Sequence, residues 1–90
     1  MMATSGAEPM ALHPDWTIVD EHHLERVWQF TDFASALEFV NKAGAICEAQ
    51  NHHADFELSW GRVLIRTWSH DIDGLSDRDT QLAEAIDALE

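Results

Sequence analysis

The sequence predicts an α+β fold whose elements follow the order β-β-α-β-β-α. Two short β-prone runs come first, and a second pair of such runs follows a long segment with helical periodicity. A second amphipathic stripe lies near the end of the chain. Two amphipathic helices beside an antiparallel sheet bury their apolar sides by packing against it. We therefore expect a two-layer domain, a four-stranded antiparallel sheet with helices packed on one face.

The first hairpin is expected between residues 16–19 and 24–31, because both runs are rich in aromatic and β-branched residues. The polar residues between them form the turn, and His22 and His23 are expected to be exposed at its tip. The edge strands of such a sheet have unpaired N–H and C=O groups. Edge-to-edge pairing of two chains is one way to satisfy them.

The long helix is expected over about residues 32–51. Thr31 or Asp32 can cap it, since either side chain can accept a hydrogen bond from a first-turn amide. Apolar residues then recur at helical spacing as far as Cys47. Cys47 lies on this apolar face, which favours a buried packing role over a nucleophilic one.

The second hairpin is expected between residues 57–60 and 62–69, with Gly61 at the turn. Gly74, in the loop that follows, is free to take a positive φ. Ser76 is expected to cap the last helix, and Asp79 three residues later completes a variant of the capping box.

One domain over residues 15–90 is expected to follow a flexible N-terminal tail over residues 1–14. The chain has 90 residues, of which 46% are hydrophobic and four are Trp, which suits a single packed core. Residues 1–14 hold both prolines and lack the basic region and apolar run of a secretory signal.

Charge and cysteine content exclude several classes of function. The formal net charge is −12, with 17 acidic against 5 basic residues, so neither direct nucleic-acid binding nor binding to an anionic membrane is expected. No stretch is long and apolar enough to span a bilayer. Cys47 is the only cysteine, which fits the reducing cytoplasm.

Three histidines carry most of the chemical content of the chain. His52 and His53 lie where the long helix ends, and His70 lies where the fourth strand ends. Imidazole titrates near neutral pH, so these residues can serve as general acid and general base. A three-histidine metal site is the second interpretation, which the adjacent pair disfavours. Ordinary loop histidines that bond the backbone are the third, and spacing alone leaves all three open.

Two carboxylates could support the histidines. Glu48 precedes His52 by four residues and could orient it, although a carboxylate on the exposed side of a helix is the commoner case. Asp79 could bond a group of the site, although its capping role explains it without function. Trp60 and Trp68 are expected in the core or at an interface.

The segment with Glu48, His52-His53, Ser69-His70 and Gly74 to Asp79 resembles the signature of the pterin-4a-carbinolamine dehydratases. That signature is Glu, three variable residues and His-His-Pro, followed by Thr-His and Gly-Leu-Ser/Thr-x-x-Asp. Phe30 to Phe33 also resembles the entry into the family's long helix. The resemblance extends over roughly residues 16–89, and the family's fold agrees with the order derived above.

The resemblance implies a metal-free dehydratase that removes water from 4a-hydroxytetrahydropterin and needs no cofactor. It implies that His52 and His70 carry the acid–base steps and that His53 binds and orients the pterin. Glu48, Asn51 and Asp79 would support the histidines or the ring. It also implies a homodimer or homotetramer, and a place in the recycling of the pterin used by aromatic amino acid hydroxylases.

Two positions depart from the family pattern: Ala54 replaces the Pro after His-His, and Ser69 replaces the Thr before the third His. Proline fixes φ and restricts the preceding residue, so Ala54 should leave His53 less preorganised. The same fold family includes non-catalytic members, a transcription dimerisation cofactor and a Rubisco assembly chaperone. An interaction module of that kind is therefore the alternative, and the retention of all three histidines favours the enzyme.

Overall fold

A computed structural model describes residues 12–89 of the chain. The predicted order of elements is confirmed, with four strands and two helices in the described part. Their bounds are β1 Thr17–Val19, β2 His23–Gln29, α1 Phe33–Gln50, β3 Asp55–Ser59, β4 Arg62–Thr67 and α2 Asp77–Asp87.

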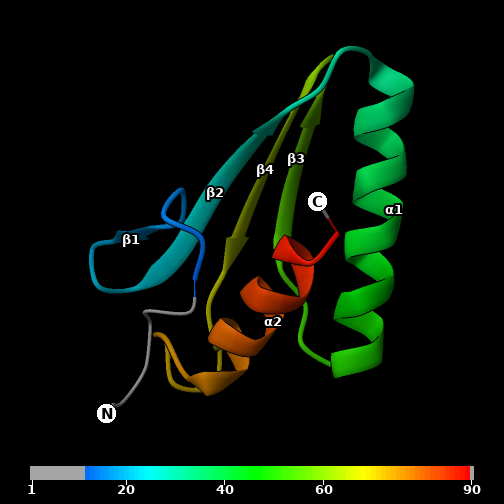
Figure 1. Ribbon diagram of the computed structural model, residues 1–90. Helices are drawn as coiled ribbons and strands as arrows, with labels where there is room; N and C mark the ends of the chain where they lie inside the picture. The colour runs from blue at the N-terminus through cyan, green and yellow to red at the C-terminus, as the bar shows by residue number, and fades with distance from the viewer. Residues whose placement is uncertain (1–11, 90) are drawn as a thin grey trace, which may run out of the picture.

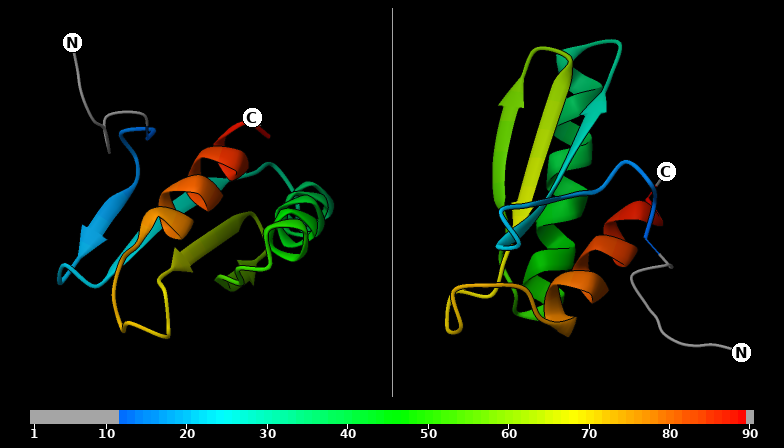
Figure 2. Two further views of the ribbon diagram at one scale, coloured as in Figure 1. Left: turned by 90° about the horizontal axis from the view of Figure 1, so that it is seen from below. Right: turned by 90° about the vertical axis from the view of Figure 1, so that its left-hand side faces the viewer.

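The strands form one antiparallel sheet in the order β1-β2-β4-β3, and both helices lie on one side of it (Figures 1 and 2). The predicted α+β architecture is therefore confirmed. The last residues of α1, the end of β4 and the start of α2 all lie at the same end of the molecule, the lower end in Figure 1. This arrangement brings together three segments that are distant in sequence.

The core lies between the sheet and the helices. Alternate residues of β4 point into it, and Val63, Ile65 and Thr67 are fully buried. From the helices, Ala43 and Cys47 of α1 meet Leu82 and Ile86 of α2 in the same buried cluster, together with other apolar residues. The predicted burial of Cys47 is confirmed, since its exposed fraction is 2%.

The bounds of α1 follow from its caps. The Asp32 carboxylate accepts a hydrogen bond of 2.7 Å from the Ser35 amide, as predicted for an N-cap. At the other end Asn51 has a φ of 53°, and the His52 amide donates back to the Cys47 carbonyl over 3.1 Å. A left-handed residue with such a bond is the Schellman ending of a helix. It turns the chain sharply just before the histidine pair.

The β3–β4 turn contains a glycine that the packing requires. A Cβ at Gly61 would lie 2.7 Å from the Phe30 carbonyl oxygen, which is too close for any other residue without a shift. The Phe30 amide also donates to the Gly61 carbonyl over 2.8 Å. The turn is where we predicted it, and β3 begins at Asp55, two residues earlier than expected.

The segment before β1 is tied to the end of α2. Asp87 accepts a hydrogen bond of 2.9 Å from the Trp16 indole and pairs with Arg26 of β2 at 2.6 Å. The His13 amide also donates to Asp87, and Leu12 packs against the core. Residues 1–11 of the predicted tail lie outside the described residues.

Two expectations about the turns were wrong. His22 and His23 are half-buried rather than exposed, because both rings pack near Trp68 (centroid distances of 5.2 and 6.0 Å). In the loop after β4, the positive φ belongs to Asp73, at 51°, and not to Gly74. Neither helix within residues 12–89 is long and apolar enough to cross a membrane.

Candidate active site

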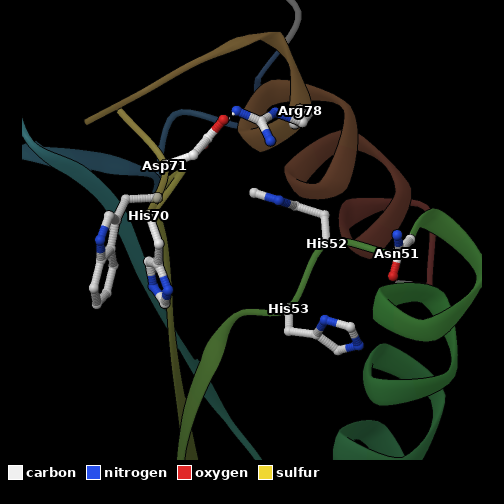
Figure 3. Close-up of a pocket in the computed structure, with 7 residues that line it drawn as sticks. Asn51, His52, His53, His70, Asp71 and Arg78 are labelled. Carbon is white, nitrogen blue, oxygen red and sulfur yellow. Dashed lines mark hydrogen bonds and ion pairs between the residues drawn. The ribbon is translucent and has the colours of Figure 1, made fainter. Parts of the chain in front are cut away.

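A pocket of about 360 Å³ lies where the end of α1, the end of β4 and the start of α2 meet (Figure 3). This volume is within the range of small-molecule sites in proteins. His52 and His70 face the same open space, whereas the ring of His53 points toward α1. The residues that line it are Asn51, His52, His53, Trp68, His70, Asp71 and Arg78.

The structure thus brings together all three histidines predicted as site residues. His52 and His53 follow the Schellman ending of α1, and His70 follows β4 by three residues. Although His52 and His53 are adjacent, their rings have different partners: the Asp79 carboxylate for His52 and the Glu48 carboxylate for His53. The two adjacent rings therefore lie in different chemical surroundings.

Asp79 is a fully buried carboxylate that contacts His52 from outside the pocket lining. Its Oδ1 lies 2.7 Å from His52 Nε2 and accepts a bond of 2.7 Å from the Thr67 hydroxyl. Its Oδ2 accepts bonds from the Ser69 hydroxyl at 2.8 Å and from the Ser76 amide at 3.0 Å. The predicted capping box at Ser76 is confirmed, and the same carboxylate also holds a site histidine.

These hydrogen bonds fix the charge of Asp79. Burial would raise the pKa of the carboxyl, but the bonds that it accepts outweigh burial and hold the pKa below its ordinary value. The carboxylate is therefore ionised near neutral pH. Since it can only accept, His52 Nε2 must carry a proton and donate it. His52 Nδ1 is then the ring nitrogen that remains for a ligand.

A chain of hydroxyls links the buried carboxylate to the rim of the pocket. Arg78 Nε donates to the Ser76 hydroxyl at 3.2 Å, and the Ser76 and Ser69 hydroxyl oxygens lie 2.6 Å apart. Ser69 uses its own proton on Asp79, so the proton between the two serines comes from Ser76. The hydroxyl retained at Ser69, where the family has Thr, is thus engaged.

Glu48 supports His53 rather than His52. Glu48 Oε2 lies 2.5 Å from His53 Nε2, and the two side chains are 78% and 59% exposed. The interpretation that Glu48 could orient His52 is wrong, because α1 ends at Gln50 and the turn at Asn51 carries His52 toward Asp79. Asn51 lines the pocket, and its backbone forms the turn.

His70 lies against an aromatic wall. Its ring centroid is 4.4 Å from that of Trp68, which also lines the pocket. At the rim, Arg78 Nη2 donates to Asp71 Oδ1 over 2.7 Å, and this bond holds the pKa of the Asp71 carboxyl below its ordinary value. Trp68 is therefore part of the site, not only of a core or interface as we expected.

Ala54 occupies the position where the family pattern has Pro, and its side chain packs half-buried against the core. The nearby Cys47 thiol is buried, and burial raises its pKa.

Several residues of the site were missed from sequence. The hydroxyls of Thr67 and Ser69 alternate with Trp68 along the end of β4, which places both on the buried side. Buried hydroxyls need partners, and Asp79, the predicted capping-box residue of the last helix, was available as one. That signal could have been read. The Asp71–Arg78 pair depends on how the loop folds and left no such signal.

No group of three or more His, Cys, Asp or Glu side chains within residues 12–89 is arranged to hold a metal ion. The arrangement instead joins two imidazole–carboxylate pairs and a third imidazole around one pocket. A buried carboxylate that fixes a histidine tautomer is typical of acid–base sites. Fold and pocket together define a small α+β protein with three histidines around one pocket.

The chain belongs to the pterin 4 alpha carbinolamine dehydratase family, whose sequence pattern matches residues 3–89. A relative from Rubrobacter xylanophilus, provisionally named as such a dehydratase, is 47% identical over 76 residues, which cover 84% of this chain and 71% of the relative. A similarly named relative from Alkaliphilus metalliredigens is 43% identical over 76 residues, 84% of this chain and 68% of its own.

Two solved structures share the fold. A protein from Brucella melitensis, described as a transcriptional coactivator/pterin dehydratase, superposes with a TM-score of 0.82 at 27% identity, over 89% of this chain and 85% of that one. A pterin dehydratase-like RuBisCO assembly factor of the alpha-carboxysome superposes with a TM-score of 0.72 at 19% identity, over 86% and 90%. At that identity the second likeness bears on the fold alone.

Proposed function

We propose that this protein is a dehydratase that removes water from 4a-hydroxytetrahydropterin and yields quinonoid dihydropterin. The observation that carries the proposal is that His52, paired with the buried Asp79, and His70 line the same pocket. Membership of the family supports the substrate class. The reaction needs one proton given and one taken, which two histidines with different surroundings can do.

His52 is proposed as the general base. In the neutral ring, the Nε2–H group donates a hydrogen bond to the Asp79 carboxylate, and Nδ1 carries a lone pair that can accept a proton. This nitrogen would remove the hydrogen on N5 of the pterin. The electron pair left on N5 forms the double bond to C4a as the C4a–O bond breaks. Asp79 would stabilise the imidazolium that results, as carboxylates do in other histidine sites.

His70 is proposed as the general acid. The C4a hydroxyl must take up a proton to leave as water, and His70 in its protonated form can supply it. His70 is exposed at the pocket and lies against Trp68, so solvent can restore its proton between turnovers. One proton leaves the substrate and one enters it, so the reaction balances without a metal or a redox cofactor.

His53, Glu48 and Asn51 are proposed to bind and orient the pterin. His53 lines the pocket, and its ring is held by the Glu48 carboxylate of α1. All three residues are exposed, and they lack the burial that strengthens electrostatic effects on a reaction. We expect their loss to weaken substrate binding more than the chemical step.

The alternative is an interaction module without catalytic activity. The descriptions of the two solved structures name a transcriptional coactivator and a RuBisCO assembly factor, which keeps this alternative in view. The complete histidine set and the pocket favour the enzyme, because a module selected only for its surface has no need of a buried Asp79–His52 pair. The cytoplasm, an association into dimers or tetramers, and a link to aromatic amino acid hydroxylases remain predictions.

A stopped-flow dehydration assay on 4a-hydroxytetrahydropterin tests the proposal. We expect the wild-type protein to accelerate water loss, and His52→Ala and His70→Ala each to reduce kcat by about 10²- to 10⁴-fold. His13→Ala is the matched control, since His13 lies outside the pocket. A wild-type rate equal to the uncatalysed rate would overturn the proposal and leave the interaction module.

A further inference from the structure

Two histidines outside the proposed acid–base set pack behind the site. His22 and His23 connect the β1–β2 turn to the start of β2. Their ring centroids lie 5.2 and 6.0 Å from that of Trp68, and Trp68 in turn lies 4.4 Å from His70. The imidazoles of His22 and His23 thus reach His70 through a single indole ring that also lines the pocket.

A hydrogen bond joins the same turn to the loop that carries His70. His22 Nε2 lies 2.7 Å from Asp73 Oδ1, although the two residues are 51 positions apart in sequence. Asp73 follows His70 by three residues, and its amide donates to the His70 carbonyl at 3.3 Å. The loop is closed at its base by two backbone bonds between Ser69 and Gly74, of 2.7 and 3.3 Å. Fixing Asp73 therefore fixes the loop that presents His70.

Both turns contain residues with a left-handed backbone. Asp73 has a φ of 51°, and Asp20 and Glu21 beside His22 each have a φ of 55°. A left-handed conformation is unfavourable for a residue other than Gly, although Asp tolerates it better than most. The His22–Asp73 bond joins these two turns, one on each side of Trp68 in the contact chain.

The two histidine rings are also coupled to each other. His22 Nδ1 and His23 Nδ1 lie 3.1 Å apart, so one nitrogen donates and the other accepts. The rings meet edge to face, with their planes at 84°. Neither ring can rotate freely without losing this bond, and both therefore hold a fixed surface against Trp68.

We propose that His22, His23 and Asp73 are positioning residues for His70: they hold Trp68 against its ring and fix the loop that presents it to the pocket. The kinetic part of this inference rests on the proposed dehydratase function, whereas the structural part does not. It gives a role to the histidine pair of the β1–β2 turn, which the proposed acid–base mechanism leaves without one.

The structural test is the NMR spectrum of the His70 imidazole in the full-length protein. The Trp68 ring current shifts the His70 ring protons, and these can be assigned with His70→Ala. We expect His22→Leu and Asp73→Gly to move the His70 resonances toward the values of a histidine without a neighbouring aromatic ring. Asp73→Gly suits the positive φ and replaces a side chain that is 87% exposed, so the fold should survive. Unchanged His70 resonances in both variants would overturn the inference.

Conservative and distant substitutions separate positioning from a general loss of structure. Asp73→Asn keeps an oxygen that can accept from His22 and should retain most of the wild-type His70 shift. His13→Leu removes a histidine elsewhere and should leave it unchanged. In the dehydration assay we expect His22→Leu to lower kcat by about tenfold with little change in KM, and to alter the pH profile of kcat. An unaltered kcat and pH profile would contradict the kinetic part.

The two proposals can fail separately. If the wild-type protein does not dehydrate the pterin but the His70 resonances move in His22→Leu and Asp73→Gly, the proposed function fails and the positioning role stands. If the wild type is active and the variants match it in both resonances and kcat, the proposed function stands and the positioning role fails.

Discussion

His52 and His53 are adjacent in sequence and each meets a carboxylate, yet the two pairs lie in opposite surroundings. The His52–Asp79 side chains are 10% and 0% exposed, with 2.7 Å between the bonded atoms. The His53–Glu48 side chains are 59% and 78% exposed, with 2.5 Å between theirs. Distance alone would rank the exposed pair as the stronger one.

Burial reverses that ranking. Water screens the His53–Glu48 pair, and exposed pairs of this kind contribute about 0–1 kcal/mol. The Asp79 side chain is fully buried. Removing its carboxylate therefore leaves buried hydrogen-bond donors without a partner. The comparison therefore predicts that substitutions at the buried pair and its hydrogen-bond partners have much larger effects than substitutions at the exposed pair.

Asp79→Asn should have the largest effect on stability. The amide loses the charge and places an NH₂ group against the Ser69 or Thr67 hydroxyl, so we expect a loss of about 3 kcal/mol in the free energy of unfolding. Urea denaturation of the variant and the wild type measures this loss. Asp77→Asn, an exposed residue of the same helical turn, is the matched control. Equal losses in the two variants would contradict the assigned role of burial.

The contribution of Asp79 should depend on pH in one direction. The folded-state pKa of its carboxyl lies below the unfolded-state value. The stability that it supplies is therefore complete above about pH 4, the unfolded value, and is lost as the pH falls through the folded pKa. The difference in unfolding free energy between the wild type and Asp79→Asn should be constant from neutral pH down to about 5 and shrink below 4. A difference that grows on acidification would give the opposite sign to the shift.

Ser69→Ala should have an intermediate effect. It removes one of the bonds to Asp79 and interrupts the hydroxyl chain from Ser76, but leaves three other donors on the carboxylate. We expect a loss of about 1–2 kcal/mol in unfolding free energy, measured by urea denaturation. Ser69→Thr restores the hydroxyl of the family pattern and should recover most of that loss. No recovery would mean that the side-chain volume at position 69 matters more than the hydroxyl.

Glu48→Gln should have the smallest effect. The exposed pair that it breaks contributes about 0–1 kcal/mol, so the unfolding transition should change little. The expected change is in KM for the pterin, a rise of about threefold with kcat nearly unchanged, because His53 loses its orienting partner and orientation affects binding here. Steady-state kinetics measures both constants. A large fall in kcat would place Glu48 in the chemical step.

The contrast between the two pairs could be predicted only in part from sequence. Helical periodicity and the caps at Asp32 and Ser76 give the elements, because these signals depend on neighbours within a few residues. The pairing of His52 with Asp79 depends on the left-handed turn at Asn51 and on the docking of α2, which no local pattern encodes. Glu48 was therefore assigned to the wrong histidine of the pair.

The environment of the β1–β2 turn was also out of reach of sequence analysis. A run of polar residues between two strands predicts an exposed turn, and that expectation holds for most hairpins. Here the contact with Trp68 and Asp73 comes from a loop some fifty residues later, so it depends on the packing of the whole domain.

The ending of α1 has a consequence for how this chain tolerates changes in length. The Schellman turn joins the histidine pair to the last turn of the helix. The length of α1 therefore determines the direction in which both rings point. One extra residue within α1 would rotate everything beyond it by about 100° around the helix axis. His52 would then face away from Asp79, although every residue of the site would still be present. Insertions in this lineage should therefore collect in the turns at the far end of the molecule and be absent from the interior of α1.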